Sequence, residues 1–343
     1  MEDIPVWLDC DPGHDDAVAI LLASFLPWFK LVGISTVHGN ASLENTTTNA
    51  ISILTAFEKF DVNVYPGAEK PLIKALHVAE DIHGKSGLDG TALLPSPAFG
   101  PQPDHSAVAA MAQAIEDHPG QLAIVATGTL SNVALLVERN PDLLDKIAYV
   151  SIMGGGIELG NWTKYAEFNI WCDAKAAEVV LNNPILAPKT ILVPIDLTHQ
   201  AIATEDILTK IQKGDQLQVP NSAHKRSLVR QMLYELLTFF ADTYKHTFGF
   251  NDGPPVHDPL AVVCLLPFYK KQLPNFDIPE LNFKFTRYDL EIVQGGEAEG
   301  QTKPIAQSEN GVIVAESIDI PKFWSIVLQA VDNLDNHVSS SAV

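Results

Sequence analysis

Near its start the chain reads Ile4-Pro5-Val6-Trp7-Leu8 and continues directly as Asp9-Cys10-Asp11-Pro12-Gly13-His14-Asp15-Asp16. The apolar run predicts a buried strand, and the Pro-Gly pair predicts a tight turn into a following helix. Carboxylates held within about 4 to 6 Å raise one another's pKa unless a cation or several donors compensate them. The segment therefore predicts a strand-turn-helix unit that holds a bound cation.

A purely structural interpretation explains only part of this cluster. Asp is a good N-cap, and acids in the first turn of a helix are favoured by its dipole, which accounts for Asp15 or Asp16. Asp9 and Asp11 alternate off the end of the strand and remain unexplained. Hard oxygen ligands, with no Cys or His at zinc spacing, indicate Ca²⁺ or Mg²⁺.

Composition excludes several classes of protein. The 343 residues are 46% apolar, and 22 Lys plus Arg stand against 42 Asp plus Glu, a net charge of −20. This balance argues against nucleic acid and anionic membranes as partners and favours a neutral or cationic ligand. Three separated cysteines in apolar surroundings indicate reduced core residues. The longest apolar run, 17–29, is too short to span a bilayer, and no signal peptide is visible, so we expect a cytoplasmic protein, with the nucleus as a second location.

Short β-branched runs alternate with helical patterns over the first two-thirds of the chain, which predicts a parallel α/β sheet. The expected strands are 4–8, 30–37, 121–126, 147–153 and 190–195. The expected helices between them are 16–24, 45–57, 106–117, 132–139 and 174–181. We therefore expect an open, mainly parallel, Rossmann-related sheet with helices on both faces.

The last third is predicted to be helical and then β. The expected helices are 204–213, 222–247, 259–266 and 321–334, and the expected strands are 290–293 and 312–314. We expect one domain, 1–343, with a helical cap built from insertions. The Gly- and Pro-rich stretch 83–103 is too long for a simple connector and predicts a lid, a binding loop or a disordered segment.

Ligands of parallel α/β sheets bind outside the carboxyl ends of the strands, so the residues after each strand form one rim. Polar residues that can hydrogen-bond sugar hydroxyls dominate this rim; they are Asn40, Asn161, Glu167 and Asn169. The phosphate-binding Lys of a P-loop is missing. The rim thus predicts a site for a polar, hydroxyl-bearing ligand.

These residues also carry a family resemblance. The quoted motifs are Asp9-x-Asp11-Pro12-Gly13-x-Asp15-Asp16-Ala17-Val18-Ala19, Gly39-Asn40, Ile82-His83-Gly84, Ala166-Glu167-Phe168-Asn169 and Val256-His257-Asp258-Pro259. Through them the chain resembles the inosine–uridine-preferring nucleoside hydrolases, over residues 4 to about 262. It is most similar to the fungal uridine ribohydrolase branch.

The resemblance implies a metal site and a base for the attacking water. It implies one Ca²⁺ held by Asp11, Asp16, Asp258 and the carbonyl of Thr127. This ion would also bind the ribose 2′- and 3′-hydroxyls. Asp11 or Asp15 would take the proton of a water that attacks C1′, and Asp9 would support the loop.

The resemblance also implies the residues that contact substrate. Asn40, Asn161, Glu167, Phe168 and Asn169 match substrate-binding positions. His257 matches the position of a general acid or a base-contacting residue, and His83 matches a second histidine at the base. Phe240 and Tyr244 lie one turn apart on a predicted helix where relatives place base-contacting side chains, so Tyr244 is expected to bind substrate; Arg230 and Gln231 are further candidates.

The expected function is Ca²⁺-dependent hydrolysis of the N-glycosidic bond of ribonucleosides to ribose and free base, in nucleoside salvage. The expected substrate is uridine, with inosine, cytidine and nicotinamide riboside as alternatives, and the enzyme is expected to be a homodimer or homotetramer. A haloacid-dehalogenase-like Mg²⁺ phosphatase would use Asp9 and Asp11, but Gly13 stands where that class has Thr or Val. A non-catalytic Ca²⁺-dependent nucleoside or sugar sensor is the second alternative.

Overall fold

The computed structural model describes residues 3–102, 106–214 and 227–341. Its sheet has nine strands in the order β3-β2-β1-β4-β5-β6-β9-β7-β8. Strands β1 to β6 are parallel to their neighbours, β9 is parallel to β6, and β7 is antiparallel to both β8 and β9. The strands are β1 (Ile4–Cys10), β2 (Phe29–Thr36), β3 (Val64–Pro66), β4 (Ala123–Ala126), β5 (Tyr149–Met153), β6 (Thr190–Val193), β7 (Lys284–Ile292), β8 (Thr302–Gln307) and β9 (Val312–Ser317).

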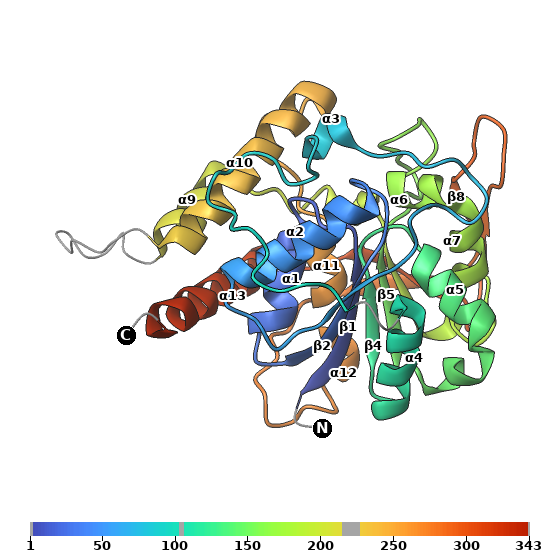
Figure 1. Ribbon diagram of the computed structural model, residues 1–343. Helices are drawn as coiled ribbons and strands as arrows, with labels where there is room; N and C mark the ends of the chain where they lie inside the picture. The colour runs from blue at the N-terminus through green and yellow to red at the C-terminus, as the bar shows by residue number, and fades with distance from the viewer. Residues whose placement is uncertain (1–2, 103–105, 215–226, 342–343) are drawn as a thin grey trace.

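Helices cover both faces of the sheet. They are α1 (Asp16–Phe25), α2 (Leu43–Ala56), α3 (Glu80–His83), α4 (Ala107–Asp117), α5 (Ser131–Arg139), α6 (Phe168–Cys172), α7 (Ala174–Leu181), α8 (Ile195–Thr198), α9 (Glu205–Lys213), α10 (Leu228–Phe248), α11 (Asp258–Val263), α12 (Leu266–Tyr269) and α13 (Ile320–Ser341), with 3₁₀ turns η1 (Pro141–Lys146) and η2 (Ala187–Lys189). Figure 1 shows α4, α5 and α7 on one side of β1, β4 and β5, and α1, α11 and α13 on the other.

Two apolar cores form because the central strands present large apolar side chains to both faces. Strand β1 is buried along its whole length, as is β4, which is the pattern of parallel strands covered on both sides. One core joins the sheet to α1, α11 and α13, and the other joins it to α4, α5 and α7. Cys10 and Cys264 are buried free thiols in the first core, and Cys172 is a free thiol buried in a small separate cluster with Ala79 and Phe168.

The fold class predicted from the sequence is confirmed, as are the five strands expected in the first two-thirds of the chain. Strands β3 and β8 were not predicted, because β3 has three residues and β8 contains Pro304. The helix expected over 259–266 is present as α11 but ends earlier, at Val263. The chain forms α11 and then α12, because Pro267 has no N–H to continue α11 and instead occupies the first turn of α12.

A helical layer lies over the carboxyl ends of the strands. Helix α10 packs on α9, α3 and α13, and Figure 1 shows α3 and α10 above the end of the sheet to which β1 points. Residues 222–226 of the helix predicted over 222–247 lie outside the described residues. The layer places α10 next to the loop that follows β1.

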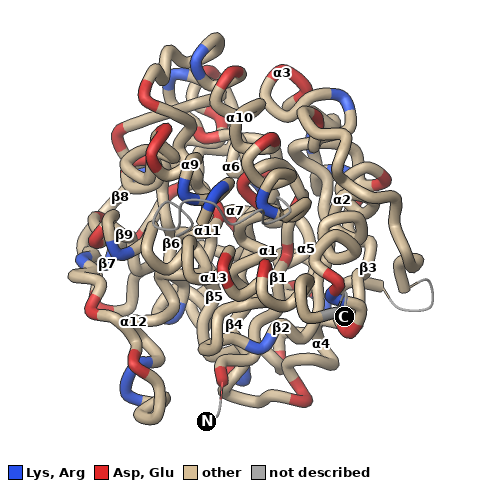
Figure 2. Tube along the Cα trace, turned by 90° about the vertical axis from the view of Figure 1, so that its left-hand side faces the viewer, with Lys and Arg blue, Asp and Glu red and all other residues tan. Residues whose placement is uncertain are grey.

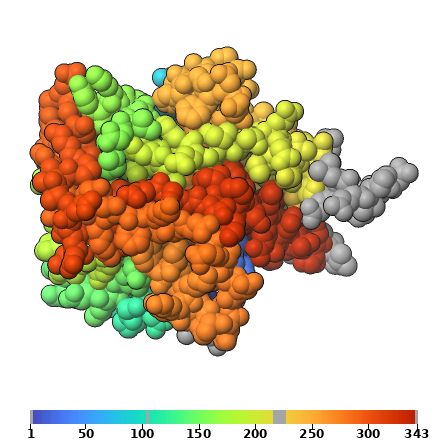
Figure 3. Space-filling model, turned by 180° about the vertical axis from the view of Figure 1, so that it is seen from behind, coloured from blue at the N-terminus to red at the C-terminus, as the bar shows by residue number. Residues whose placement is uncertain are grey.

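The last part of the chain covers one face of the molecule. Figure 3 shows the orange and red residues of β7, β8, β9 and α13 across the face opposite that of Figure 1. Figure 2 shows Asp and Glu distributed along the trace, from β8 on one side to α2 on the other. Among the described residues, no helix is both long and apolar enough to cross a membrane.

Trp7 connects the packing of the sheet to the end of β1. Its ring packs over Gly33 of β2, and its Nε1 donates to Ser35 Oγ at 2.8 Å. Ser35 Oγ in turn donates to Asp9 Oδ1 at 2.5 Å. A Cβ on Gly33 would lie 2.5 Å from the Trp7 ring, so only glycine fits here.

We therefore expect Gly33→Ala to lower the free energy of unfolding by about 2 kcal/mol, because the added methyl must displace a packed indole. Denaturant unfolding measures this. Gly100→Ala is the matched control, because a Cβ there meets no atom within 4 Å. Equal stability of the two variants would contradict the packing argument.

Candidate active site

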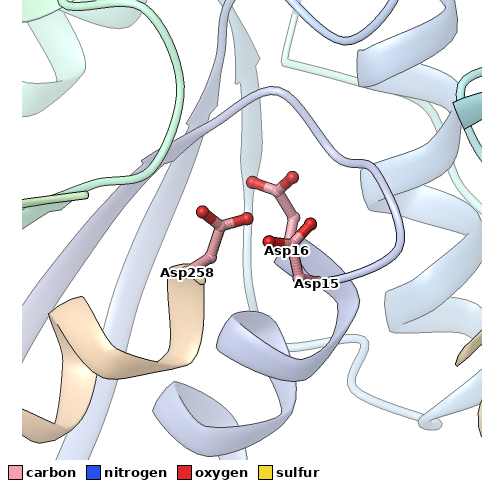
Figure 4. A group of neighbouring side chains, drawn as sticks. All are labelled: Asp15, Asp16 and Asp258. Carbon is pink, nitrogen blue, oxygen red and sulfur yellow. The ribbon is translucent and has the colours of Figure 1, made fainter. Parts of the chain in front are cut away.

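Three buried carboxylates meet at the start of two helices. Asp15, Asp16 and Asp258 each offer an oxygen that lies within 4.8 Å of the other two. Figure 4 shows Asp15 and Asp16 at the first turn of α1 and Asp258 at the first turn of α11, with their side chains turned toward one space. The helix dipoles favour negative charge at both positions, but they do not neutralise three carboxylates.

Asp15 does not serve as a capping side chain for α1. It occupies the N-cap position without a side-chain capping bond, and its Oδ2 instead accepts from the backbone N–H of His257 at 3.1 Å. Burial, together with the charge of Asp16, raises the pKa of Asp15 to about 7. Burial and then the charges of Asp15 and Asp16 hold the pKa of Asp258 well above its usual range. The cluster is therefore short of positive charge.

Asp11 and Asp16 are arranged around Asn40. The backbone N–H of Asn40 donates to Asp11 Oδ2 at 2.7 Å, and its Nδ2 donates to Asp16 Oδ2 at 3.2 Å. Asp16 Oδ1 accepts from Thr127 Oγ1 at 2.8 Å. Asp11 is not one of the three clustered acids, but its buried Oδ1 has no hydrogen-bond partner among the described residues. Burial and then the charge of Asp16 raise the pKa of Asp11 well above its ordinary value.

Asp9 lies behind this layer. Its Oδ1 accepts from Ser35 Oγ and from Asn132 Nδ2, the latter at 2.7 Å, and its backbone carbonyl accepts from Thr127 N at 2.9 Å. Burial raises the pKa of Asp9 to about 7. These contacts tie the ends of β1, β2 and β4 together and hold Thr127 in place.

One cleft collects the substrate-binding residues predicted from the sequence. All seven line it: Asn40, His83, Asn161, Glu167, Phe168, Asn169 and Tyr244. Asp15, Thr127, His257 and Asp258 line it too, whereas Asp11 and Asp16 lie behind the wall. No Lys or Arg is among the residues that line this cleft.

Local hydrogen bonds orient the polar side chains that line the cleft. Glu167 caps α6, and its carboxylate accepts from the backbone N–H groups of Gly155, Asn169 and Ile170 at 2.8 to 3.0 Å. Burial nevertheless raises the pKa of Glu167. Asn169 Nδ2 donates to the carbonyl of Thr127 at 2.8 Å, and Asn161 Oδ1 accepts from Phe168 N at 2.9 Å. The amides are thus oriented before any ligand binds.

Thr198, His257 and Tyr244 form a hydrogen-bonded chain, of which His257 and Tyr244 line the cleft. His257 Nδ1 lies 2.6 Å from Thr198 Oγ1, and its Nε2 lies 2.8 Å from the Tyr244 hydroxyl. Burial raises the pKa of Tyr244 well above its usual range, so the phenol keeps its proton. Burial also lowers the pKa of His257. A neutral imidazole and a phenol that carries a proton therefore face the cleft together.

Sequence reasoning missed several contributors, among them Thr198 and His14, and included two outsiders, Arg230 and Gln231. Thr198 contacts His257 but stands in no motif. His14 contacts His83, but it occupies a variable position of the aspartate motif. Arg230, a candidate for the base pocket, instead binds Asp332 and Asp335 of α13 and does not line the cleft. Gln231 hydrogen-bonds Gln212 and Glu235 and does not line the cleft. Helical spacing could find Tyr244, but it could not show which face of α10 meets α13.

The chain matches the model of the inosine-uridine preferring nucleoside hydrolases over residues 6–325. The chain belongs to this family. It is therefore a hydrolase of N-glycosidic bonds, and such nucleoside hydrolases are metal-dependent in general.

Relatives and solved structures agree with this assignment. The uridine nucleosidase of Saccharomyces cerevisiae is 41% identical over 97% of both chains. The pyrimidine-specific ribonucleoside hydrolase RihA of Escherichia coli O9:H4 is 41% identical over 77% of this chain and 79% of its own. A purine-preferring ribonucleoside hydrolase from Gardnerella vaginalis has the same fold, with a TM-score of 0.82 and 24% identity over 96% of this chain and 99% of its own.

The residues present fit a metal ion. Three buried carboxylates lie within 4.8 Å of one another, and the buried Asp11 Oδ1 beside Asp16 has no partner among the described residues. The described residues offer only oxygen donors in this group, which suits a hard divalent cation better than zinc.

We expect Ca²⁺ to raise the Tm by about 5 to 10 °C at pH 7.5, and by less at pH 5.5. The pKa of Asp15 is about 7 in the metal-free fold, above the value of about 4 in an unfolded chain. The metal-free fold therefore loses stability as the pH rises from about 4 to about 7, and a cation restores it. Thermal unfolding with Ca²⁺ or a chelator measures both effects.

The matched variants are Asp258→Asn and Asp252→Asn, because Asp252 is exposed. Only Asp258→Asn should lose the Ca²⁺-dependent rise in Tm. An undiminished rise in that variant would show that Ca²⁺ binds elsewhere.

Proposed function

We propose that this enzyme hydrolyses uridine to ribose and uracil in a Ca²⁺-dependent reaction of nucleoside salvage, and that inosine, cytidine and nicotinamide riboside are poorer substrates. The observation that carries the proposal is one cleft lined by two acids of the carboxylate cluster, by polar groups that can bind a sugar and by the hydrogen-bonded Tyr244–His257 pair. A nucleoside needs all three surroundings, because its C1′ develops positive charge while its base leaves with negative charge.

Asp11, Asp16, Asp258 and the Thr127 carbonyl would hold the ion. When bound, Ca²⁺ supplies positive charge that holds the ribose diol and the attacking water beside C1′. Asp15 lines the cleft within 4.8 Å of the carboxylates of Asp16 and Asp258, which places it where it can accept a proton from the attacking water. Asp11, whose Oδ1 has no described partner, is the other candidate base.

The ribose would be held by amides and one carboxylate. Asn40, Asn161, Glu167 and Asn169 line the polar side of the cleft, with Phe168 beside them. Because backbone contacts already orient Glu167 and Asn169, they can bind hydroxyls without first reorganising.

The leaving base would take a proton from the Tyr244–His257 pair. The Tyr244 hydroxyl and His257 Nε2 are 2.8 Å apart, so a proton can pass between them, and Thr198 holds the other imidazole nitrogen. His83 and Phe240 complete the base side of the cleft.

Two alternatives are less consistent with the site. A phosphatase would need cationic side chains for its substrate, and the residues that line the cleft include no Lys or Arg. A non-catalytic sensor would not need both a proton donor and a buried acid in the wall of the cleft. The names of the relatives from yeast and Escherichia coli favour a pyrimidine nucleoside.

Three further features belong to the same proposal. We propose that residues 1–343 form one domain, because the two cores share one nine-stranded sheet among the described residues. We also propose a homodimer or homotetramer located in the cytoplasm, with the nucleus as a second location.

We expect the purified enzyme to release ribose from uridine without phosphate, and a chelator followed by Ca²⁺ to abolish and restore this release. Asp16→Asn should lower kcat/KM by at least about 100-fold, since it removes a charged ligand. Asp252→Asn is the control. Formation of ribose 1-phosphate, or cleavage of phosphomonoesters alone, would contradict the proposal.

We expect Tyr244→Phe to lower kcat for uridine by about 100-fold with a small change in KM, because the phenol acts on the departing base. Tyr234→Phe, on the same helix but outside the cleft, is the matched control. A loss confined to KM would indicate that Tyr244 only binds the base.

A further inference from the structure

His14 is a buried histidine that does not line the cleft but contacts a histidine that does. Its side chain is fully buried, with its ring stacked against His83, Phe239 and Phe240 at centroid distances of 5.1 to 5.4 Å. Its Nδ1 lies 3.1 Å from His83 Nδ1, and its Nε2 lies 2.8 Å from the carbonyl oxygen of Asp89. Both ring nitrogens of His14 are thus engaged.

The carbonyl of Asp89 determines where the proton of His14 sits. A carbonyl oxygen only accepts hydrogen bonds, so a contact of 2.8 Å requires a proton on His14 Nε2. In a neutral imidazole the other nitrogen, Nδ1, then carries a lone pair. The hydrogen bond between the two histidines consequently needs its proton on His83 Nδ1.

The loop itself fixes the Asp89 carbonyl, which is the first group in the row of hydrogen bonds from Asp89 through His14 to His83. Asp89 N donates to the carbonyl of His83 at 3.2 Å, and the Asp89 carboxylate accepts from Ser86 Oγ and Lys85 N. Residues 83–89 therefore form a closed loop that presents the Asp89 carbonyl to His14. The order of protons is set by backbone geometry.

One contact favours the opposite arrangement of protons, with His83 Nδ1 unprotonated. The backbone N–H of His14 points at His83 Nδ1 from 3.5 Å, which would suit an unprotonated Nδ1. This distance is at the outer limit of hydrogen bonding, whereas the bond to Asp89 is short. The shorter contact with Asp89 therefore determines which nitrogen of each ring carries the proton.

Gly13 keeps His83 in this position. A Cβ on Gly13 would lie 2.5 Å from His83 Nδ1 and 2.7 Å from Cε1, so these atoms pack directly on the Gly13 backbone. His83 Nε2 has no hydrogen-bond partner among the described residues, and His83 lines the cleft. Nε2 is thus the nitrogen available to a ligand.

We propose that His14 is a positioning residue that holds His83 as its Nδ1–H tautomer, so that His83 Nε2 accepts a hydrogen bond from an N–H of the nucleoside base. His83 then recognises the base and does not protonate it, which leaves the Tyr244–His257 pair as the donor. The base-recognition part rests on the proposed function. Uracil offers N3–H to such an acceptor, whereas cytosine has a lone pair at N3.

The tautomer can be measured without substrate. We expect long-range ¹H–¹⁵N spectra of ¹⁵N-histidine-labelled enzyme to show His83 protonated at Nδ1 and unprotonated at Nε2, with His83→Gln identifying the signal. In His14→Phe, which keeps the stacked ring but removes both nitrogens, this single tautomer should be lost. His118→Phe, remote from the cleft, is the control. A proton on His83 Nε2 in the unmodified enzyme would overturn the proposal.

Kinetics test the consequence for the base. We expect His14→Phe to lower the ratio of kcat/KM for uridine to that for cytidine by about 10-fold, the value of one hydrogen bond. In a His83→Ala background the same change should leave the ratio unaltered, since His14 acts through His83. An unaltered ratio in the single variant, or an equal fall in both backgrounds, would contradict the proposal. Failure of the unmodified enzyme to release ribose would instead refute the proposed function and leave the tautomer measurement valid.

Discussion

The rest of the structure depends on the burial of several carboxylates at one end of the sheet. Asp9, Asp11, Asp15, Asp16 and Asp258 are all nearly inaccessible to water. Isolated buried charges of this kind are strongly unfavourable, so every neighbouring element supplies donors to them. Strand β2 contributes Ser35, the following turn contributes Asn40, and the segment after β4 contributes Thr127. The remaining deficit of positive charge is what suits the site to a divalent cation.

The sequence predicts most of this arrangement because its signals are local. An apolar run followed by four acids marks β1 and the cluster, and polar residues after successive strands mark the rim. The parallel sheet then brings those residues together without further information. Asp258 is different, because only the family motif around Val256 and Pro259 indicated that a segment so distant along the chain joins the cluster.

The sequence could not predict contacts that depend on how helices face one another. Arg230 and Tyr244 both lie on α10, yet one faces α13 and the other faces the cleft. His14 occupies a variable position of the aspartate motif, and its partners His83 and Asp89 are 69 and 75 residues away. Nor could the sequence distinguish the surroundings of Asp11 and Asp15, the two candidates for accepting a proton from water, because both follow the same strand. Only the packing of α11 brings the backbone N–H of His257 to Asp15.

The hydrogen bond between Asp15 and His257 joins residues 242 positions apart. During synthesis on the ribosome, the acids after β1 emerge long before α11 exists to complete their surroundings. Until then the nascent chain holds a cluster of carboxylates without Asp258, which is added only when more than two-thirds of the protein has been made. The cluster is therefore completed late, and a polypeptide truncated before α11 would lack one of its three acids.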